Sequence, residues 1–141
     1  MKLALIAALL FLPLLSQAKD DSSEADTFIE CANLYSLYLR NVAEKVSEAE
    51  RENLMIDIGV ASTLGKLLSS ETYLARQANI LLHEEYAKQE TAAATESIDL
   101  YTTLFMLRLE RCKTQIANGA TRYQRELAEL VAKQQRQSTE P

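Results

Sequence analysis

Apolar residues recur every three or four positions over most of this chain, which is the spacing of one face of an α-helix. The longest such row follows steps of 4, 3, 4, 3 and 4 residues and consists of Ile98, Thr102, Phe105, Leu109, Cys112 and Ile116. The same face is widened by three leucines, Leu100, Leu104 and Leu107. We therefore expect a helix that runs to Asn118 and is the most deeply buried helix of the protein.

The same spacing, together with capping signals, predicts four other helices. One begins near Ser23, and the others cover residues 48–68, 71–93 and 121–134. A turn near Thr95–Ser97 separates the third helix from the fourth, because one rod from Glu71 to Asn118 would be about 70 Å long. A domain of this size could not cover both faces of such a rod.

Each of the first three helices has a side rich in apolar residues. In the first helix this side consists of Phe28, Cys31, Tyr35, Tyr38 and Val42. In the second helix it consists of Leu54, Ile58, Ala61, Leu64 and Leu68. The third helix gathers on one side Leu74, Ala75, Ala78, Leu81, Leu82 and Glu85. Its other side carries Arg76, Ile80, His83 and Ala87, and we expect His83 to face solvent.

Helix-breaking residues are scarce, which favours an all-α fold. The two prolines are Pro13 and Pro141, and the glycines are Gly59, Gly65 and Gly119. A β-sandwich would need a turn roughly every 8–12 residues. We expect Gly59 and Gly65 to allow close packing against a neighbouring backbone, with a functional hinge or pocket as the alternative, and Asn118-Gly119 to end the fourth helix.

The first 18 residues have the three parts of a secretory signal peptide. Lys2 gives a positive start, Leu3–Leu15 is an apolar run, and Ser16-Gln17-Ala18 places small residues at a cleavage site. The alternative is an uncleaved anchor, although the run is shorter than the ~20 residues of a membrane span. We expect cleavage after Ala18, a helical domain over residues 19–134 and a disordered tail over residues 135–141. The protein would then be exported to the periplasm or the extracellular space.

The charge of the exported chain limits its partners. Removal of Lys2 from the 15 basic side chains leaves 14, beside 20 acidic ones, so the net charge is near −6. A negative chain is a poor ligand for nucleic acid, whose binding needs clustered Lys and Arg. Beyond the signal peptide no apolar run predicts a membrane span.

The two cysteines, Cys31 and Cys112, both fall on predicted inner faces. In an exported protein such a pair favours a disulfide, and two buried free thiols are the alternative. Helices that run up, down, up and down place the two residues at similar heights, about 12 and 9 Å. The sequence therefore predicts an up-down-up-down four-helix bundle with a C-terminal amphipathic helix, clamped by one disulfide.

Residues that common catalytic and metal sites require do not occur in the necessary patterns. His83 is the single histidine, whereas a di-iron bundle needs two Glu-x-x-His pairs and catalytic zinc needs three protein ligands. Neither a Gly-x-Ser-x-Gly motif nor a glycine-rich phosphate loop is present. We interpret neighbouring carboxylates such as Glu84 and Glu85 as solvated. The expectation is a protein with no catalytic residue, no metal and no cofactor.

Three features could serve binding. The six tyrosines either pack at the core boundary or line a ligand cavity: Tyr35, Tyr38, Tyr73, Tyr86, Tyr101 and Tyr123. Acidic residues gather at the predicted upper end of the bundle, either solvated or docking a basic partner: Glu44, Glu48, Glu50, Glu52, Glu90, Glu96 and Asp99. The narrow apolar side of the last helix either completes the core or projects toward another chain: Tyr123, Leu127, Leu130 and Val131.

The sequence thus favours an exported, non-enzymatic helical bundle that acts through protein–protein interaction. Adaptor, chaperone, inhibitor and secreted factor all fit this description, with another protein or a second copy as the partner. The alternative is a carrier of a small ligand in a tyrosine-lined cavity between helices.

Overall fold

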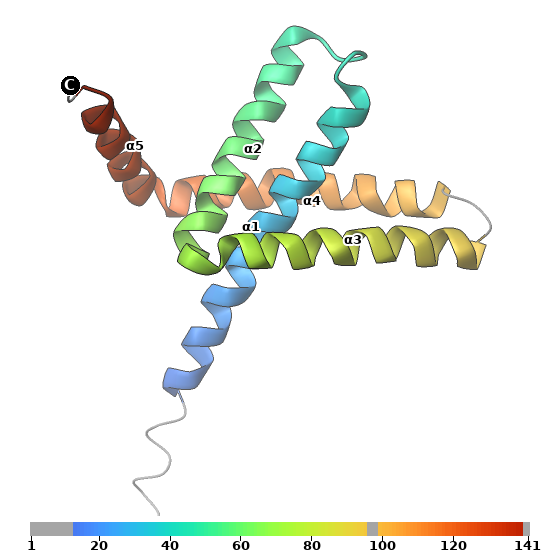
Figure 1. The fold of residues 1–141 in the computed structure, drawn as a ribbon, viewed down its shortest axis with the longest axis horizontal. Coiled ribbons are helices and arrows are strands. Elements are labelled where there is room, and N and C mark those ends of the chain that lie inside the picture. The colour runs from blue at the N-terminus through green and yellow to red at the C-terminus, as the bar shows by residue number, and fades with distance from the viewer. Residues whose placement is uncertain (1–12, 96–98, 140–141) are drawn as a thin grey trace, which may run out of the picture.

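The computed structural model describes residues 13–95 and 99–139, and the side chains of residues 23–93 and 99–138. Its elements are α1 (Pro13–Val42), α2 (Glu48–Ser69), the 3-10 turn η1 (Ser70–Thr72), α3 (Tyr73–Thr95), α4 (Asp99–Arg122) and α5 (Gln124–Thr139) (Figure 1). The predicted all-α bundle with one disulfide is confirmed.

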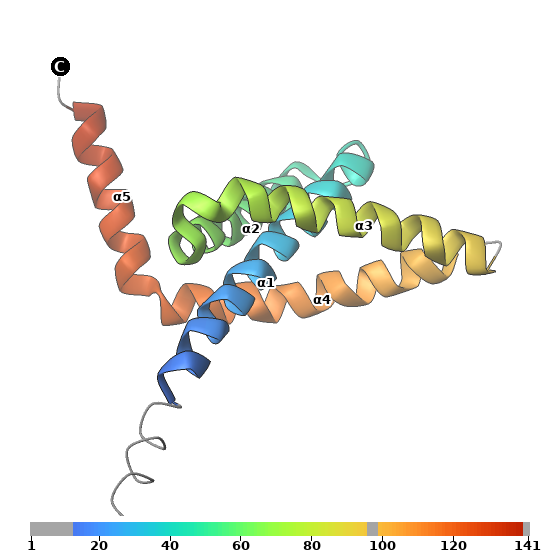
Figure 2. The ribbon, with the colours of Figure 1, turned by 60° about the horizontal axis from the view of Figure 1, so that its bottom comes forward.

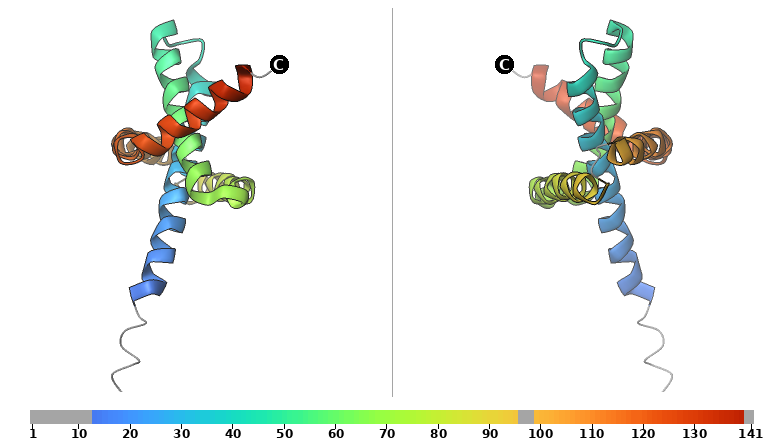
Figure 3. Two further views of the ribbon diagram at one scale, coloured as in Figure 1. Left: turned by 90° about the vertical axis from the view of Figure 1, so that its left-hand side faces the viewer. Right: turned by 90° about the vertical axis from the view of Figure 1, so that its right-hand side faces the viewer.

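The helices form two antiparallel hairpins, α1–α2 and α3–α4, and the hairpins cross one another (Figures 1 and 2). The up-and-down order predicted for the bundle is therefore found within each hairpin. Seen along the second hairpin, α1 passes between α3 and α4 (Figure 3). This arrangement makes α1 the central helix, in contact with α2, α3 and α4.

The core is centred on α1 and not on α4. The buried apolar residues of α1 are Ala25, Phe28, Ile29, Cys31, Ala32, Leu34 and Tyr35. In α4 the buried apolar side chains are Leu109, Cys112 and Ile116, whereas Leu100, Leu104 and Leu107 are 46%, 46% and 59% exposed. The expectation that α4 is the most buried helix is thus wrong, because its first half extends beyond α1 and α2.

The disulfide joins α1 to α4 where the two hairpins cross. Cys31 and Cys112 are bonded with their Cα atoms 5.5 Å apart, and both are at least 97% buried. The predicted pairing is confirmed, but its geometric reason differs. The two cysteines meet because their helices cross at that level, not because the helices run side by side.

Several helix boundaries differ from those expected. The helix α1 begins at Pro13, ahead of Ser23, and η1 precedes α3. The helix α5 continues to Thr139, through residues for which a disordered tail was expected. At the start of α2 the predicted cap is confirmed, since the Ser47 hydroxyl accepts a hydrogen bond from the Glu50 N–H at 3.2 Å.

The turn predicted near Thr95–Ser97 agrees with the end of α3 at Thr95 and the start of α4 at Asp99. Residues 96–98, and the predicted signal segment up to residue 12, lie outside the described residues. The rest of the predicted signal segment, Pro13–Ala18, belongs to α1.

The three glycines have different surroundings. A Cβ atom on Gly65 would lie 2.8 Å from Ile29 Cγ1, so the expected close packing is confirmed there. At Gly59 it is wrong, because a Cβ atom would meet nothing within 4 Å. Gly119 does not end α4, which continues to Arg122; instead it is buried against the ring of Phe28.

Candidate functional site

The helix α3 contacts α1 through several polar side chains. Arg76 of α3 forms an ion pair with Asp26 of α1 at 2.9 Å. The next residue of α3 is Gln77, whose amide donates to Asn33 Oδ1 at 3.4 Å. Asn33 is buried, and its Nδ2 atom has no hydrogen-bond partner among the described residues. The side of α3 that faces the core is therefore its mixed, partly polar side.

The strongest polar contacts converge on Glu84, which is only 8% exposed. The Tyr101 hydroxyl donates to Glu84 Oε1 at 2.5 Å, and the Arg108 guanidinium pairs with Glu84 Oε2 at 2.8 Å. Arg108 also binds Glu30 of α1, its Nε donating at 3.0 Å. The interpretation of Glu84 as solvated is wrong, whereas its neighbour Glu85 is exposed as expected.

The network joins α1, α3 and α4 and changes the acidity of its members. Burial raises the pKa of Tyr101, and the hydrogen bond to Glu84 adds to the rise, because the neutral hydroxyl is the donor. Burial likewise raises the pKa of Tyr35 to about 12, with smaller contributions from Asp57 and Glu110. Both tyrosines are thus held in their neutral form by the fold.

The raised tyrosine pKa values predict a loss of stability at alkaline pH. The folded state holds these protons more tightly than the unfolded chain, so the stabilisation is fully present below pH 10.0 and is lost as the pH rises toward 12. Tyr101→Phe should reduce this loss and also cost about 1–2 kcal/mol at pH 7, since Glu84 loses a donor. Urea unfolding as a function of pH measures both effects.

The matched control for this prediction is Tyr86→Phe, because Tyr86 is 55% exposed. It should change the free energy of unfolding by less than about 0.5 kcal/mol at any pH. Identical pH profiles for the two variants would show that the hydroxyl of Tyr101 has no special role.

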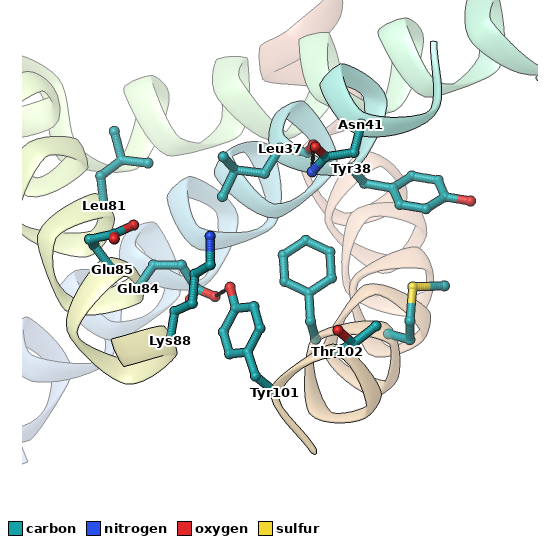
Figure 4. Close-up of a pocket in the computed structure, with 11 residues that line it drawn as sticks. Leu37, Tyr38, Asn41, Leu81, Glu84, Glu85, Lys88, Tyr101 and Thr102 are labelled. Carbon is teal, nitrogen blue, oxygen red and sulfur yellow. Dashed lines mark hydrogen bonds between the residues drawn. The ribbon is translucent and has the colours of Figure 1, made fainter. Parts of the chain in front are cut away.

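A cleft of about 490 Å³ opens beside this network, between α1, α3 and α4 (Figure 4). Its walls are mainly apolar, from Leu37, Tyr38, Leu81, Tyr101, Phe105 and Met106. Its polar groups are Asn41, Glu84, Glu85, Lys88 and Thr102. The rings of Tyr101 and Phe105 lie 6.0 Å apart, centre to centre. Two of the six tyrosines thus line a cavity, as one interpretation of the sequence expected.

The opposite side of α3 carries a row of exposed apolar residues, which we call the leucine face. Its large members are Leu74, Leu82 and Tyr86, which are 73%, 54% and 55% exposed, whereas Leu81 faces the cleft. Between them lie the small residues Ala75 and Ala78, both exposed. The apolar side chains of α3 are thus divided between its core-facing side, where Tyr73 is buried, and this outward face.

The predicted acidic surface is divided between two places. Glu44, Glu48, Glu50 and Glu52 are exposed around the α1–α2 turn. Glu90 and Asp99 are exposed near the α3–α4 connection, and Glu96 lies outside the described residues. Because the hairpins cross, the α1–α2 turn lies far from the end of α3 and the start of α4 (Figure 1). The structure does not bring these carboxylates together into one surface.

The predicted apolar side of α5 lies across a groove from α2. Tyr123 sits at the break between α4 and α5, where its hydroxyl donates to Glu24 Oε2 at 2.8 Å. Leu127 and Leu130 are half-buried and Val131 is 54% exposed. The groove measures about 680 Å³, with Ile56, Val60 and Leu67 on its α2 side. The helix α5 therefore projects from the bundle (Figure 1), which is the second of the two arrangements expected for its apolar side.

The described residues offer little for metal chemistry or membrane insertion. Among them, no group of three or more His, Cys, Asp or Glu side chains is placed to hold a metal ion. His83 is exposed and lines a depression of about 500 Å³ beside Leu104 and Leu107. Within residues 13–95 and 99–139, no helix has the length and apolar character needed to cross a membrane.

No family model, no curated protein and no solved structure matches this chain.

Proposed function

We propose that this protein acts by binding another protein chain, not by catalysis, and that the leucine face of α3 is its contact surface. The observation that carries the proposal is the orientation of α3. Its mixed side, with Arg76, Gln77 and Glu84, faces the core, while Leu74, Leu82 and Tyr86 face outward. An amphipathic helix in a self-sufficient domain has the reverse orientation.

The physical reason is the cost of leaving a contiguous apolar surface in water. Single exposed leucines are ordinary, but contiguous patches of a few hundred Å² mark interaction sites in soluble proteins. The exposed leucines of α4, Leu104 and Leu107 among them, lie on the same hairpin but border a separate depression beside His83, so they are not counted as part of the leucine face.

Site-specific photo-cross-linking tests the proposal. A photoreactive phenylalanine analogue placed at Leu82 should give an adduct of protein size in the producing cells. The same analogue at Met55, which is 60% exposed on α2 and so equally accessible, should give none. Equal labelling at both positions, or no protein adduct at Leu82, would contradict a contact surface on α3.

The proposal includes export of the mature chain from Lys19. The residues that support it are the signal-like segment up to Ala18 and a buried disulfide, which persists in oxidising compartments. The intact mass of the exported protein tests this point. A mass that includes Met1–Ala18 would contradict cleavage.

A second candidate function is that of a small-ligand carrier, which the cleft beside Tyr38, Tyr101 and Phe105 supports. Its volume of about 490 Å³ falls in the range of small-molecule sites, and it combines apolar walls with a few polar groups. Native mass spectrometry should then detect a bound organic molecule that Thr102→Trp, placed in the cleft wall, displaces. A mass equal to that of the polypeptide alone would argue against a carrier.

A further inference from the structure

We infer that the cleft between α1, α3 and α4 binds a small organic cation, an amine or quaternary ammonium group on an apolar body. This inference rests on the second candidate function, that of a small-ligand carrier, and names the chemical class of its ligand. It does not depend on the leucine face. Three observations support it: the aromatic rings of the cleft, the carboxylates on its α3 side, and the sign of the electrostatic field inside it.

Aromatic rings from two helices line the cleft. Tyr38 belongs to α1, and Tyr101 and Phe105 lie on successive turns of α4. The rings of Tyr101 and Phe105 are tilted by 44° relative to each other, with 6.0 Å between their centres. The face of an aromatic ring carries partial negative charge and attracts an ammonium group within about 6 Å of its centre. A cation in the cleft therefore gains an attraction that a neutral ligand of the same shape does not.

Two carboxylates, those of Glu84 and Glu85, lie on the α3 side of the cleft, across from Tyr38 (Figure 4). Glu84 is buried, and both of its oxygens are engaged by Tyr101 and Arg108. Glu85 is exposed at the edge of the cleft. It accepts a hydrogen bond at 3.2 Å from the neutral amide of Gln89, a contact that leaves its negative charge in place. Glu85 is therefore the carboxylate that we expect to pair with the ammonium group of a ligand.

The field inside the cleft has the sign that attracts a cation. Arg108 is shared between Glu84 and Glu30, so one guanidinium group offsets two carboxylates. Burial is the largest cause of the raised pKa of Tyr101, and among the charges Glu84 raises it more than Arg108 lowers it, while Glu85 raises it further. The Tyr101 hydroxyl thus lies in a net negative field. The same field repels ligands that carry a carboxylate or a phosphate.

Lys88 is the positive side chain that lines the cleft. It is exposed, and its charge sits on a flexible four-carbon stem that can turn into solvent when a cation enters. Its ammonium group repels a cationic ligand and attracts an anionic one. Removal of this charge should therefore change the affinities of the two classes of ligand in opposite directions.

An NMR titration of the purified protein with three probes of similar shape tests the inference: 2-phenylethylamine, 2-phenylethanol and phenylacetate. The amine should bind about threefold more tightly than the alcohol and about tenfold more tightly than phenylacetate, because it alone gains the ring and carboxylate contacts. The backbone amide signals that shift should be those around residues 84–88 and 101–106.

Two variants at the edge of the cleft assign the charge preference to its residues. Lys88→Met should strengthen the binding of the amine and weaken that of phenylacetate, each by about two- to fivefold. Glu85→Gln should weaken the binding of the amine by a similar factor and leave 2-phenylethanol unchanged. The matched control is Glu90→Gln, the same change at an exposed position of α3 outside the cleft, which should leave all three affinities unchanged. Circular dichroism checks that each variant is folded.

Three results would overturn the inference: no binding of the amine up to about 10 mM, tighter binding of phenylacetate than of the amine, or weaker binding of the amine in Lys88→Met. The carrier function fails separately. If native mass spectrometry finds a neutral or acidic molecule that Thr102→Trp displaces, the carrier function stands and the cation inference is wrong. If no molecule accompanies the protein and no probe binds, both are wrong.

Discussion

Replacing both cysteines with serine, Cys31→Ser with Cys112→Ser, should lower the free energy of unfolding by as much as about 4.5 kcal/mol. The bond closes a loop between residues 81 positions apart, and a closed loop of that length removes about this much chain entropy from the unfolded state. The loss is a large fraction of the 5–15 kcal/mol that typically stabilises a domain. Urea unfolding of the oxidised wild type and of the double variant measures the difference.

Reductant supplies the control for this prediction. In dithiothreitol the wild type should fall to about the stability of the double variant, while the variant itself should not respond. Because both cysteines are buried, the reduction should be carried out in denaturant before refolding. Two free thiols per chain in the unreduced, denatured wild type would contradict the bond.

The residues that form the α1–α2 contact could be identified from the sequence. Cys31, Tyr35, Ala61 and Leu64 fall on the apolar sides predicted for the first two helices, and all four are buried. Each of these helices has one distinctly apolar side, so helical spacing identifies the inner face without knowledge of the partner.

The orientation of α3 could not be identified in this way. Spacing shows which residues share a side, but it does not show whether that side meets its own chain or another one. Here Glu84 on the mixed side forms an ion pair with Arg108 and accepts a hydrogen bond from Tyr101. Both partners lie on α4, so the pattern of residues within α3 does not reveal them. The sequence did contain an indication of this orientation. Tyr73, Ile80, Glu84 and Ala87 share one side of the helix at helical spacing, and three of these four residues are apolar or aromatic.

The carboxylates expected to gather at one end of the bundle lie apart for a related reason. The predicted up-down-up-down bundle, with its four helices side by side, would bring the α1–α2 and α3–α4 turns to the same end, and Glu48 and Glu90 would then lie at that end together. The crossing of the hairpins separates them (Figure 1). Crossing depends on how side chains of two helices interlock at the contact, and at α1 and α4 that contact includes Gly119 and Phe28, whose meeting the sequence alone does not reveal.

Gly119→Ala should therefore destabilise the protein, although alanine is normally the better helix residue. A Cβ atom at this position would lie 2.6 Å from Phe28 Cε1 and 2.9 Å from Leu64 Cδ1, and both side chains are buried. Neither can move away without disturbing the core, and overpacking of this kind costs about 1–3 kcal/mol. Larger residues such as valine should cost more, because they also force α4 away from α1.

Gly59→Ala is the matched control, a glycine within a helix where an added Cβ atom meets nothing within 4 Å. There the change should stabilise the protein by up to about 1 kcal/mol through helix propensity alone. The two substitutions are chemically identical. If they change the free energy of unfolding in opposite directions in urea, the difference is due to the contact of Gly119 with Phe28. If both variants gained stability equally, α4 could not lie against α1 as closely as the structure places it, and the crossing of the two hairpins would have to be different.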